Sequence, residues 1–240
     1  MAMKTRTNTP HDRLARDTTV LLLSDYQVGP LWEPAAMQLR RDVAALAKVA
    51  STLGVPTILT AMACDDWGPT ITELTDATPR AAVVHRSVLD PWSVPRVRQA
   101  IEATGRRHLV VAGVATEMGV VRAALGAIHD GYKVHALLDV SGYFSPRAAA
   151  AAVLRMCAAG VVISNCAMVL IELVHGSLER KACDLLAVSL RHGLPRPPVA
   201  AGTGSGRRVR SRLAIADESV SRKRNAGAAF RVHGGSVDPR

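Results

Sequence analysis

The chain has 240 residues, of which 48% are hydrophobic and 21% charged, a balance that fits a globular protein and excludes wholesale disorder. Aromatic residues make up only 3%, so Ala, Val and Leu must fill the core. The net charge of +10 belongs to the ends: residues 1–17 hold four basic and two acidic residues, residues 196–240 hold ten and three, and the middle holds 16 and 15. The folded part is therefore not a basic nucleic-acid-binding domain.

From Thr18 the chain alternates between short apolar runs and helical patterns. Residues 18–25 read TTVLLLSD, a buried strand that ends at an acid. A helix is predicted next, over residues 36–53, because apolar residues recur at helical spacing until Gly54. A second strand at 55–62 follows, and then a loop through 65–80.

The second half repeats this alternation more clearly. Further strands are predicted at 81–86, 108–114, 133–139 and 161–166. The helices expected between and after them cover 94–103, 118–129, 145–160 and most of 168–192. Strands that alternate with helices in this way predict an α/β protein: a three-layer Rossmann-like fold with a roughly six-stranded parallel sheet and helices on both faces.

The ends of the chain differ from the middle. Residues 1–17 are interpreted as a flexible extension and residues 196–240 as a basic low-complexity tail rich in Gly, Ser and Arg. The tail is either a solvated extension or a weak contact to phosphates through RRVRSR and SRKR. Phe230 is its only aromatic residue, so specific single-strand recognition is not expected.

Two further absences set expectations. No apolar run reaches the ~18 residues of a membrane span, and the N-terminus lacks the apolar core of a secretory signal, so we expect a cytoplasmic protein without membrane contact. The four cysteines are far apart, with no CxxC pair and no matching His spacing. We expect buried free thiols and no metal site: Cys64, Cys157, Cys166 and Cys183.

Three segments should meet at the carboxyl edge of the sheet, where parallel sheets bind ligands. Asp25 ends the first strand, Arg86 ends the third, and GVATEMGVV (113–121) leaves the fourth and opens a helix. The first turn of that helix offers backbone N–H groups and a partial positive charge to an oxyanion. An acid, a cation and an N–H pocket in one crevice predict a catalytic site.

These residues carry a family resemblance. The segments LLLSDYQVGPL, VPTILTAM, HLVVAGVATEMGVV and HDGYKVHALLDVSGYFS resemble the isochorismatase-like superfamily, also called the cysteine hydrolases, and are most similar to a bacterial branch of small oligomeric hydrolases. The resemblance covers residues 18–195, which it identifies as an isochorismatase-like hydrolase domain. It implies a small-molecule substrate, no cofactor and a homo-oligomer, for which the apolar stretch Met168–Val174 is one possible surface.

The resemblance also implies a catalytic set from which this chain departs. In the family an Asp after the first strand, a Lys after the third and a Cys at the start of the helix after the fourth act together. Asp25 fits the first position; Arg86, or His85 one residue earlier, takes that of the Lys; Gly119 stands where the Cys belongs. Since glycine has no nucleophile, a covalent thioester at this position is excluded. Cys166 is not expected to replace it.

Isochorismatases themselves carry Gly at this position and use the Asp as a general acid on a vinyl ether. Two hypotheses therefore remain open: a hydrolase that works without a cysteine, with Asp25 as acid or base, or a non-catalytic member that binds a small molecule or supports an assembly. Under the first hypothesis the amides of Met118 and Gly119 are expected to form an anion pocket. The remaining pocket residues expected are Ala115, Thr116, Trp92 and Gln27, and the family often has a cis peptide bond between the positions of Val114 and Ala115.

Overall fold

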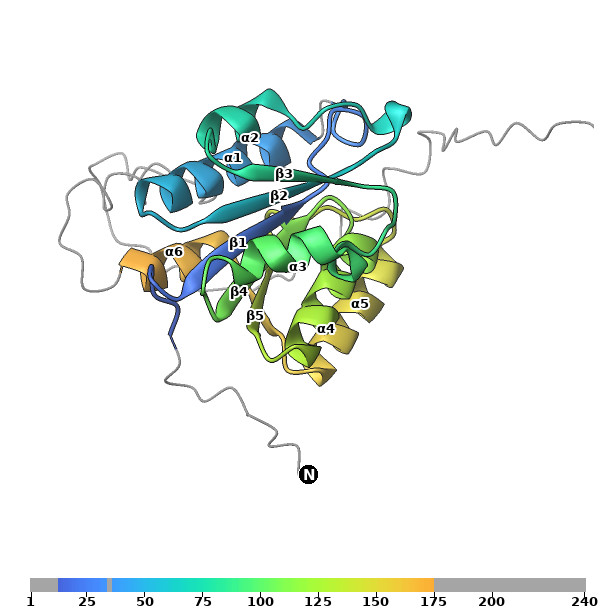
Figure 1. Ribbon diagram of the computed structural model, residues 1–240. Helices are drawn as coiled ribbons and strands as arrows, with labels where there is room; N and C mark the ends of the chain where they lie inside the picture. Colours follow the sequence, from blue (N-terminus) through green and yellow to red (C-terminus); the bar gives the residue numbers. More distant parts are fainter. Residues whose placement is uncertain (1–12, 34–35, 175–240) are drawn as a thin grey trace, which may run out of the picture. The chain divides into compact units, whose positions relative to one another are not determined.

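A six-stranded parallel sheet forms the centre of the computed structural model, which describes residues 13–33 and 36–174 (Figure 1). The strand order is β3-β2-β1-β4-β5-β6, and every neighbouring pair is parallel. The fold class predicted from the alternating pattern is confirmed. The strands are β1 (Thr19–Ser24), β2 (Thr57–Met62), β3 (Ala82–Arg86), β4 (His108–Gly113), β5 (Lys133–Leu137) and β6 (Val162–Ser164).

Helices cover both faces of this sheet (Figure 1). One face carries α1 (Met37–Thr52), α2 (Thr72–Ala77) and α6 (Cys166–Val174). The other carries α3 (Pro95–Glu102), α4 (Val121–His129) and α5 (Pro146–Ala158). Because a buried parallel strand has two covered faces, all six residues of β1 are buried. Leu21 and Leu23 pack into the first core, and Val20 and Leu22 into the second.

The order of the strands determines where the candidate site lies. The chain adds strands on one side from β1 to β3 and then crosses back to place β4 beside β1, so the order reverses between β1 and β4. Loops that leave the carboxyl ends of two such strands diverge and open a crevice between them. Asp25 follows β1, and the π-helical turn η4 (Thr116–Val120) follows β4. Two of the three segments predicted to carry function therefore flank this reversal.

The segment predicted as a loop over 65–80 contains more structure than expected. It folds into a 3-10 turn, η2 (Asp65–Trp67), and the short helix α2. The cause is tertiary, because α2 buries Leu74 against the α1 side of the core and an ion pair joins its Glu73 to Arg40 of α1 at 2.7 Å. A six-residue helix leaves too short a periodic pattern to be seen in the sequence.

The cysteine prediction is wrong in part. Cys64 and Cys157 are free but exposed, and Cys166 is free and half-buried. Cys183, the helix expected beyond residue 174, the boundary at 195/196 and the tail lie outside the described residues. The boundary at 17/18 lies within them, and Leu14, which was expected in the flexible extension, is buried in the core, where its amide donates to Glu172 Oε2 at 2.9 Å. Among the residues that are described, no helix has both the length and the apolarity to cross a membrane.

Two buried histidines lie side by side at the amino-terminal half of the sheet. His108 of β4 and His135 of β5 have ring centroids 6.3 Å apart, and both are more than nine-tenths buried. Burial lowers the pKa of His135 from 6.5 to about 4; Glu172 of α6 opposes this shift and His108 adds to it. The unfolded chain therefore binds a proton between pH 6.5 and pH 4 that the folded chain does not, so stability falls as the pH falls through this window.

Replacing His135 with Leu should remove this dependence. Between pH 7 and pH 5 the variant should lose about 2 kcal/mol less unfolding free energy than the native chain. Urea unfolding at both pH values measures the difference, with His129→Gln at an exposed histidine as the control. An equal loss in the native chain and the His135 variant would contradict the linkage.

Candidate active site

Asp25 lies in a strained position at the carboxyl end of β1. Its φ of +66° is the only positive value at a non-glycine residue in the described chain. Its amide donates to Thr60 O at 2.9 Å, and its own carbonyl accepts from Gln27 N at 2.8 Å. The left-handed conformation costs about 1 kcal/mol or more for such a residue and persists only where the surroundings hold it. This turn directs the carboxylate across the end of the sheet.

Arg86 forms a buried ion pair with this carboxylate. Nη2 of Arg86 donates to Oδ2 of Asp25. Nη1 donates to Sδ of Met62 at 2.9 Å and to the carbonyl of Val88, so three strands hold the guanidinium in place. His85 is exposed, because neighbouring strand residues point to opposite sides. Of these two residues, Arg86 is therefore the one that contacts Asp25.

Burial controls the ionisation of this pair. It raises the pKa of Asp25 to about 6, against the opposing pull of Arg86. It also lowers the pKa of Arg86, which Asp25 opposes. Asp25 Oδ1 and Arg86 Nε are buried with no hydrogen-bond partner within the described part of the chain. The pair thus holds an acid that titrates near neutral pH and keeps one polar atom of each residue unpaired.

Gly119 faces this pair directly. A Cβ placed on Gly119 would lie 3.4 Å from Oδ2 of Asp25, 3.9 Å from Nη2 of Arg86 and 3.9 Å from Cγ of Pro91. These are ordinary van der Waals distances, so a small group fits there without displacing anything. Of the predicted site residues, the structure thus brings Asp25, Arg86 and Gly119 together.

Several hydrogen-bond donors of the turn that carries Gly119 already have partners within the protein. Met118 N donates to Ala115 O at 3.2 Å and Val120 N donates to the same carbonyl at 3.3 Å. Both the amide and the hydroxyl of Thr116 donate to Gly142 O, at 2.9 and 2.8 Å. The Met118 amide, expected to serve an anion, is therefore already engaged. All peptide bonds of the described residues are trans, so the cis bond expected before Ala115 is wrong.

Gln27 fastens the loop after β1 to its neighbours. Its Nε2 donates to Met62 O at 3.0 Å and to Gly68 O at 2.6 Å, and its Oε1 accepts from Met62 N at 2.7 Å. The side chain is buried and its amide is bonded on both ends. These contacts are those of a residue that positions the loop carrying Asp25.

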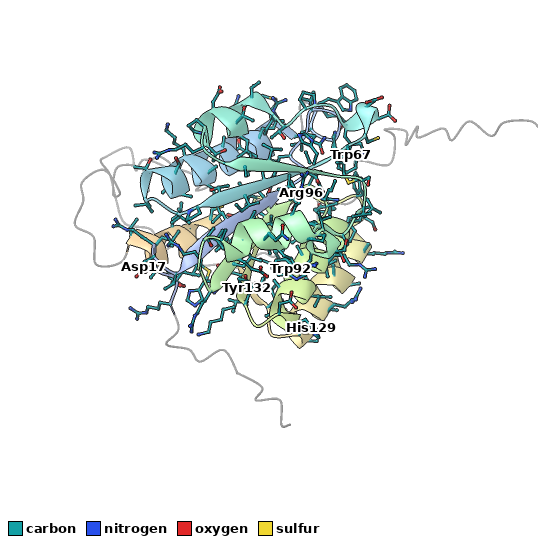
Figure 2. All side chains as sticks on the ribbon, viewed as in Figure 1. Asp17, Trp67, Trp92, Arg96, His129 and Tyr132 are labelled. Carbon is teal, nitrogen blue, oxygen red and sulfur yellow. The ribbon has the colours of Figure 1, made fainter. Side chains whose placement is uncertain are left out.

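Trp92 packs away from the ion pair. Its ring meets Tyr132 edge-on at 5.5 Å, its Nε1 donates to Asp130 Oδ2 at 2.8 Å, and a Cβ on Gly126 would lie only 2.3 Å from its ring (Figure 2). A cavity of about 540 Å³ lies beside it on the α3–α4 side. Pro91, the residue before Trp92, lies near Gly119 instead: its Cγ is 3.9 Å from the position that a Cβ on Gly119 would take.

Pro91 and Met62 are the contacts that sequence reasoning missed. Met62 ends β2, between β1 and β3, so its place at the carboxyl edge could have been found from the strand order. Pro91 has no such signal, because it reaches the site through a loop. No group of His, Cys, Asp and Glu side chains suited to a metal ion occurs among residues 13–33 and 36–174.

Comparison with known proteins shows the family of this chain. The isochorismatase domain family matches residues 19–167. The chain belongs to the isochorismatase family of hydrolases. The probable hydrolase YcaC of Escherichia coli is 34% identical over 143 residues, which are 57% of this chain and 68% of that protein. The isochorismatase domain-containing protein 2 of Bos taurus is 29% identical over 134 residues, 53% of this chain and 61% of that protein.

Solved isochorismatase-family structures share the fold. YcaC of Pseudomonas aeruginosa, solved with hexane-2,5-diol and covalent acrylamide, matches with a TM-score of 0.70 and 31% identity over 78% of this chain and 95% of its own. YcaC of Escherichia coli, an octameric hydrolase of unknown specificity, matches with a TM-score of 0.70 and 32% identity, over 77% of this chain and 92% of its own.

The ion pair makes a first prediction for this site. Arg86→Met leaves a buried carboxylate without a cation and should destabilise the protein by about 3–5 kcal/mol, and Asp25→Asn should also destabilise it. The double variant removes both charges and should cost less than the sum of the two single changes. Denaturant unfolding of all four proteins measures the coupling, and strictly additive losses would argue against a mutually stabilising pair.

Two glycines of this family member make a matched pair for a second prediction. Gly126→Ala forces a Cβ into Trp92 and should destabilise the protein by about 1–3 kcal/mol. Gly119→Ala meets only ordinary contacts and should leave the unfolding free energy unchanged within about 0.5 kcal/mol. Thermal and urea unfolding compare the two. A large loss at Gly119 would mean that the position is not open.

Proposed function

We propose that this chain is a small-molecule hydrolase that works without a cysteine nucleophile and uses Asp25 as its general acid and base. The observation that carries the proposal is the open position at Gly119, 3.4 Å from Oδ2 of a buried carboxylate. A substrate atom or a water molecule can occupy the position where the resemblance puts a Cys side chain. Covalent catalysis through residue 119 is excluded because glycine offers no nucleophile.

The ionisation of Asp25 supports this role. A general acid or base works best when its pKa lies near the working pH, and burial raises the pKa of Asp25 to about 6. Arg86 keeps its charge and serves to hold the carboxylate in place, not to carry protons. Since Nη1 of Arg86 is engaged by Met62 and Val88, Asp25 is the group left to move the proton.

The reaction that fits these parts is hydrolysis of a vinyl ether. Asp25 gives its proton to the terminal vinyl carbon, which leaves an oxocarbenium ion. A water molecule adds to the cationic carbon and returns a proton to Asp25. The hemiketal then breaks down to a ketone and an alcohol, so atoms and charge balance. This route passes through a cation, so the Gly119 amide, the remaining candidate of the turn, would position a neutral oxygen of the substrate and not an oxyanion.

A second function is supported by one observation. The Asp25–Arg86 pair is closed on itself, with Nη2 bonded to Oδ2. Such a pair also suits a non-catalytic member that binds a small molecule or supports an assembly. Under this alternative the carboxylate serves only to hold Arg86.

Turnover measurements separate the two functions. The native protein should cleave a small vinyl ether, and Asp25→Asn should lose at least about 100-fold in kcat/KM because the proton donor is gone. If Asp25 acts as the acid, the rate should fall as the pH rises through about 6, since the donor form is then lost. A rate that survives in Asp25→Asn would contradict the mechanism.

Gly119→Cys provides the parallel arm of this experiment. A cysteine at this position would meet the carboxylate and guanidinium, and small amides are the substrates to test. Acrylamide, which is covalent in the Pseudomonas relative, probes the new thiol directly. Peptide mapping compares its alkylation with that of exposed Cys64 and Cys157. If the native protein turns over neither the vinyl ether nor the small amides, while Gly119→Cys hydrolyses the amides, the non-catalytic alternative is favoured.

We also propose that the chain forms a homo-oligomer, as the octameric relative does. Met168 and Ile171 of α6 are half exposed, whereas Val169, Leu170 and Leu173 fill the core. The apolar stretch singled out in the sequence is thus part core and part surface. Weak phosphate contact by the tail and a cytoplasmic location stay predictions.

A further inference from the structure

Exposed apolar side chains gather in the loops around the candidate site. Ten large hydrophobic side chains are exposed in the described part of the chain, and six of them follow the carboxyl ends of β1, β3 and β5. These are Val28, Trp32, Val88, Leu89, Tyr143 and Phe144. Apolar surface that is concentrated around a site, and not scattered, indicates binding.

Two of these loops are bonded directly to the catalytic machinery. The Val88 carbonyl accepts from Arg86, and Val88 and Leu89 lie between Arg86 and Pro91, which both face the position above Gly119. We call Val88, Leu89, Tyr143 and Phe144 the apolar rim.

The second loop is bonded on the opposite side of the site. Glu117 Oε1 accepts from Phe144 N and from Ser145 N, both at 2.9 Å, and Gly142 accepts from Thr116. Glu117 and Thr116 belong to the same turn as Gly119. These bonds hold the backbone of Gly142, Phe144 and Ser145 next to the turn that carries Gly119.

The floor of the site offers little to a charged ligand. Asp25 and Arg86 cancel each other's formal charge, and Nη1 of Arg86 is already bonded to Met62 and Val88. One acceptor, Oδ1 of Asp25, and one donor, Nε of Arg86, are left unpaired. Binding a carboxylate end-on to both Nη atoms would require breaking existing bonds of the guanidinium.

We propose that the site selects an uncharged small molecule with an alkyl or aryl substituent, whose substituent lies on the apolar rim while its polar group reaches Asp25 and Arg86. This rests on the proposed function for the reacting end, but the rim contact itself does not need turnover. Burying one Val or Phe side chain contributes about 1.5–3 kcal/mol, enough for roughly tenfold or more in affinity.

The uncharged fluorophore N-phenyl-1-naphthylamine tests the rim by direct titration of the full chain. The native protein should bind it, and Val88→Ser and Phe144→Ser should each weaken binding about tenfold. The matched control is Leu154→Ser on α5, a side chain that is 70% exposed and lies outside these loops. Benzamide should displace the probe at lower concentration than benzoate, which has the same shape and a charge.

Several outcomes would overturn the inference. These are no probe binding by the native protein, an equal loss in Leu154→Ser, or displacement that favours benzoate. Light scattering on the same samples tests whether a second copy of the chain covers the rim instead. If the rim variants reduce the oligomer size, the rim is a contact between copies of the chain. Probe binding is measured without turnover, so a failed catalytic mechanism and a failed rim give different results.

Discussion

The buried pair of Asp25 and Arg86 is the constraint on which the site depends. Two charges away from water cost several kcal/mol each, and only close contact with further hydrogen bonds repays that cost. The fold supplies those bonds from three strand ends: the turn after β1 directs Asp25, Met62 of β2 accepts from the guanidinium, and the β3 loop accepts through Val88. These contacts also fix the loops that border the open position at Gly119. A change in any of the three strand ends therefore reaches the carboxylate.

The strained turn at Asp25 has a direct electrostatic consequence. An extended residue at the end of β1 would continue along the strand direction, whereas φ of +66° turns the chain sharply and keeps the carboxylate buried. Burial then raises its pKa to about 6 despite the cation beside it. The backbone energy held in this turn and the desolvation of the acid are thus linked. Gln27 stabilises the same turn by bonding both ends of its side-chain amide to the backbone of Met62 and Gly68.

Sequence alone predicted the sheet, the strand ends and the residues that meet there, because parallel strands with alternating helices leave strong periodic signals. It also left His85 and Arg86 as rivals, and only the alternation of side chains along β3, fixed by its packing, separates them. Contacts made by loops escaped prediction. Pro91 reaches Gly119 and Trp92 turns toward Gly126 through the tertiary path of one loop, which no local pattern encodes. The short helix α2 was missed for the same reason, since its stability comes from Leu74 in the core.

Arg86 and Gly119, the two departures from the pattern that the resemblance implies, are physically compatible with each other. A guanidinium needs more partners than an ammonium, and here Nη1 takes Met62 and Val88 while Nη2 takes Asp25. A thiolate at residue 119 would carry a second negative charge close to that carboxylate and compete with it for Nη2, which lies 3.9 Å from the Cβ position. Glycine at residue 119 carries no thiolate, so Nη2 of Arg86 can bind Asp25 alone. Under the function proposed above, such a site moves a proton at a carboxylate with a pKa of about 6, and the nucleophile comes from water.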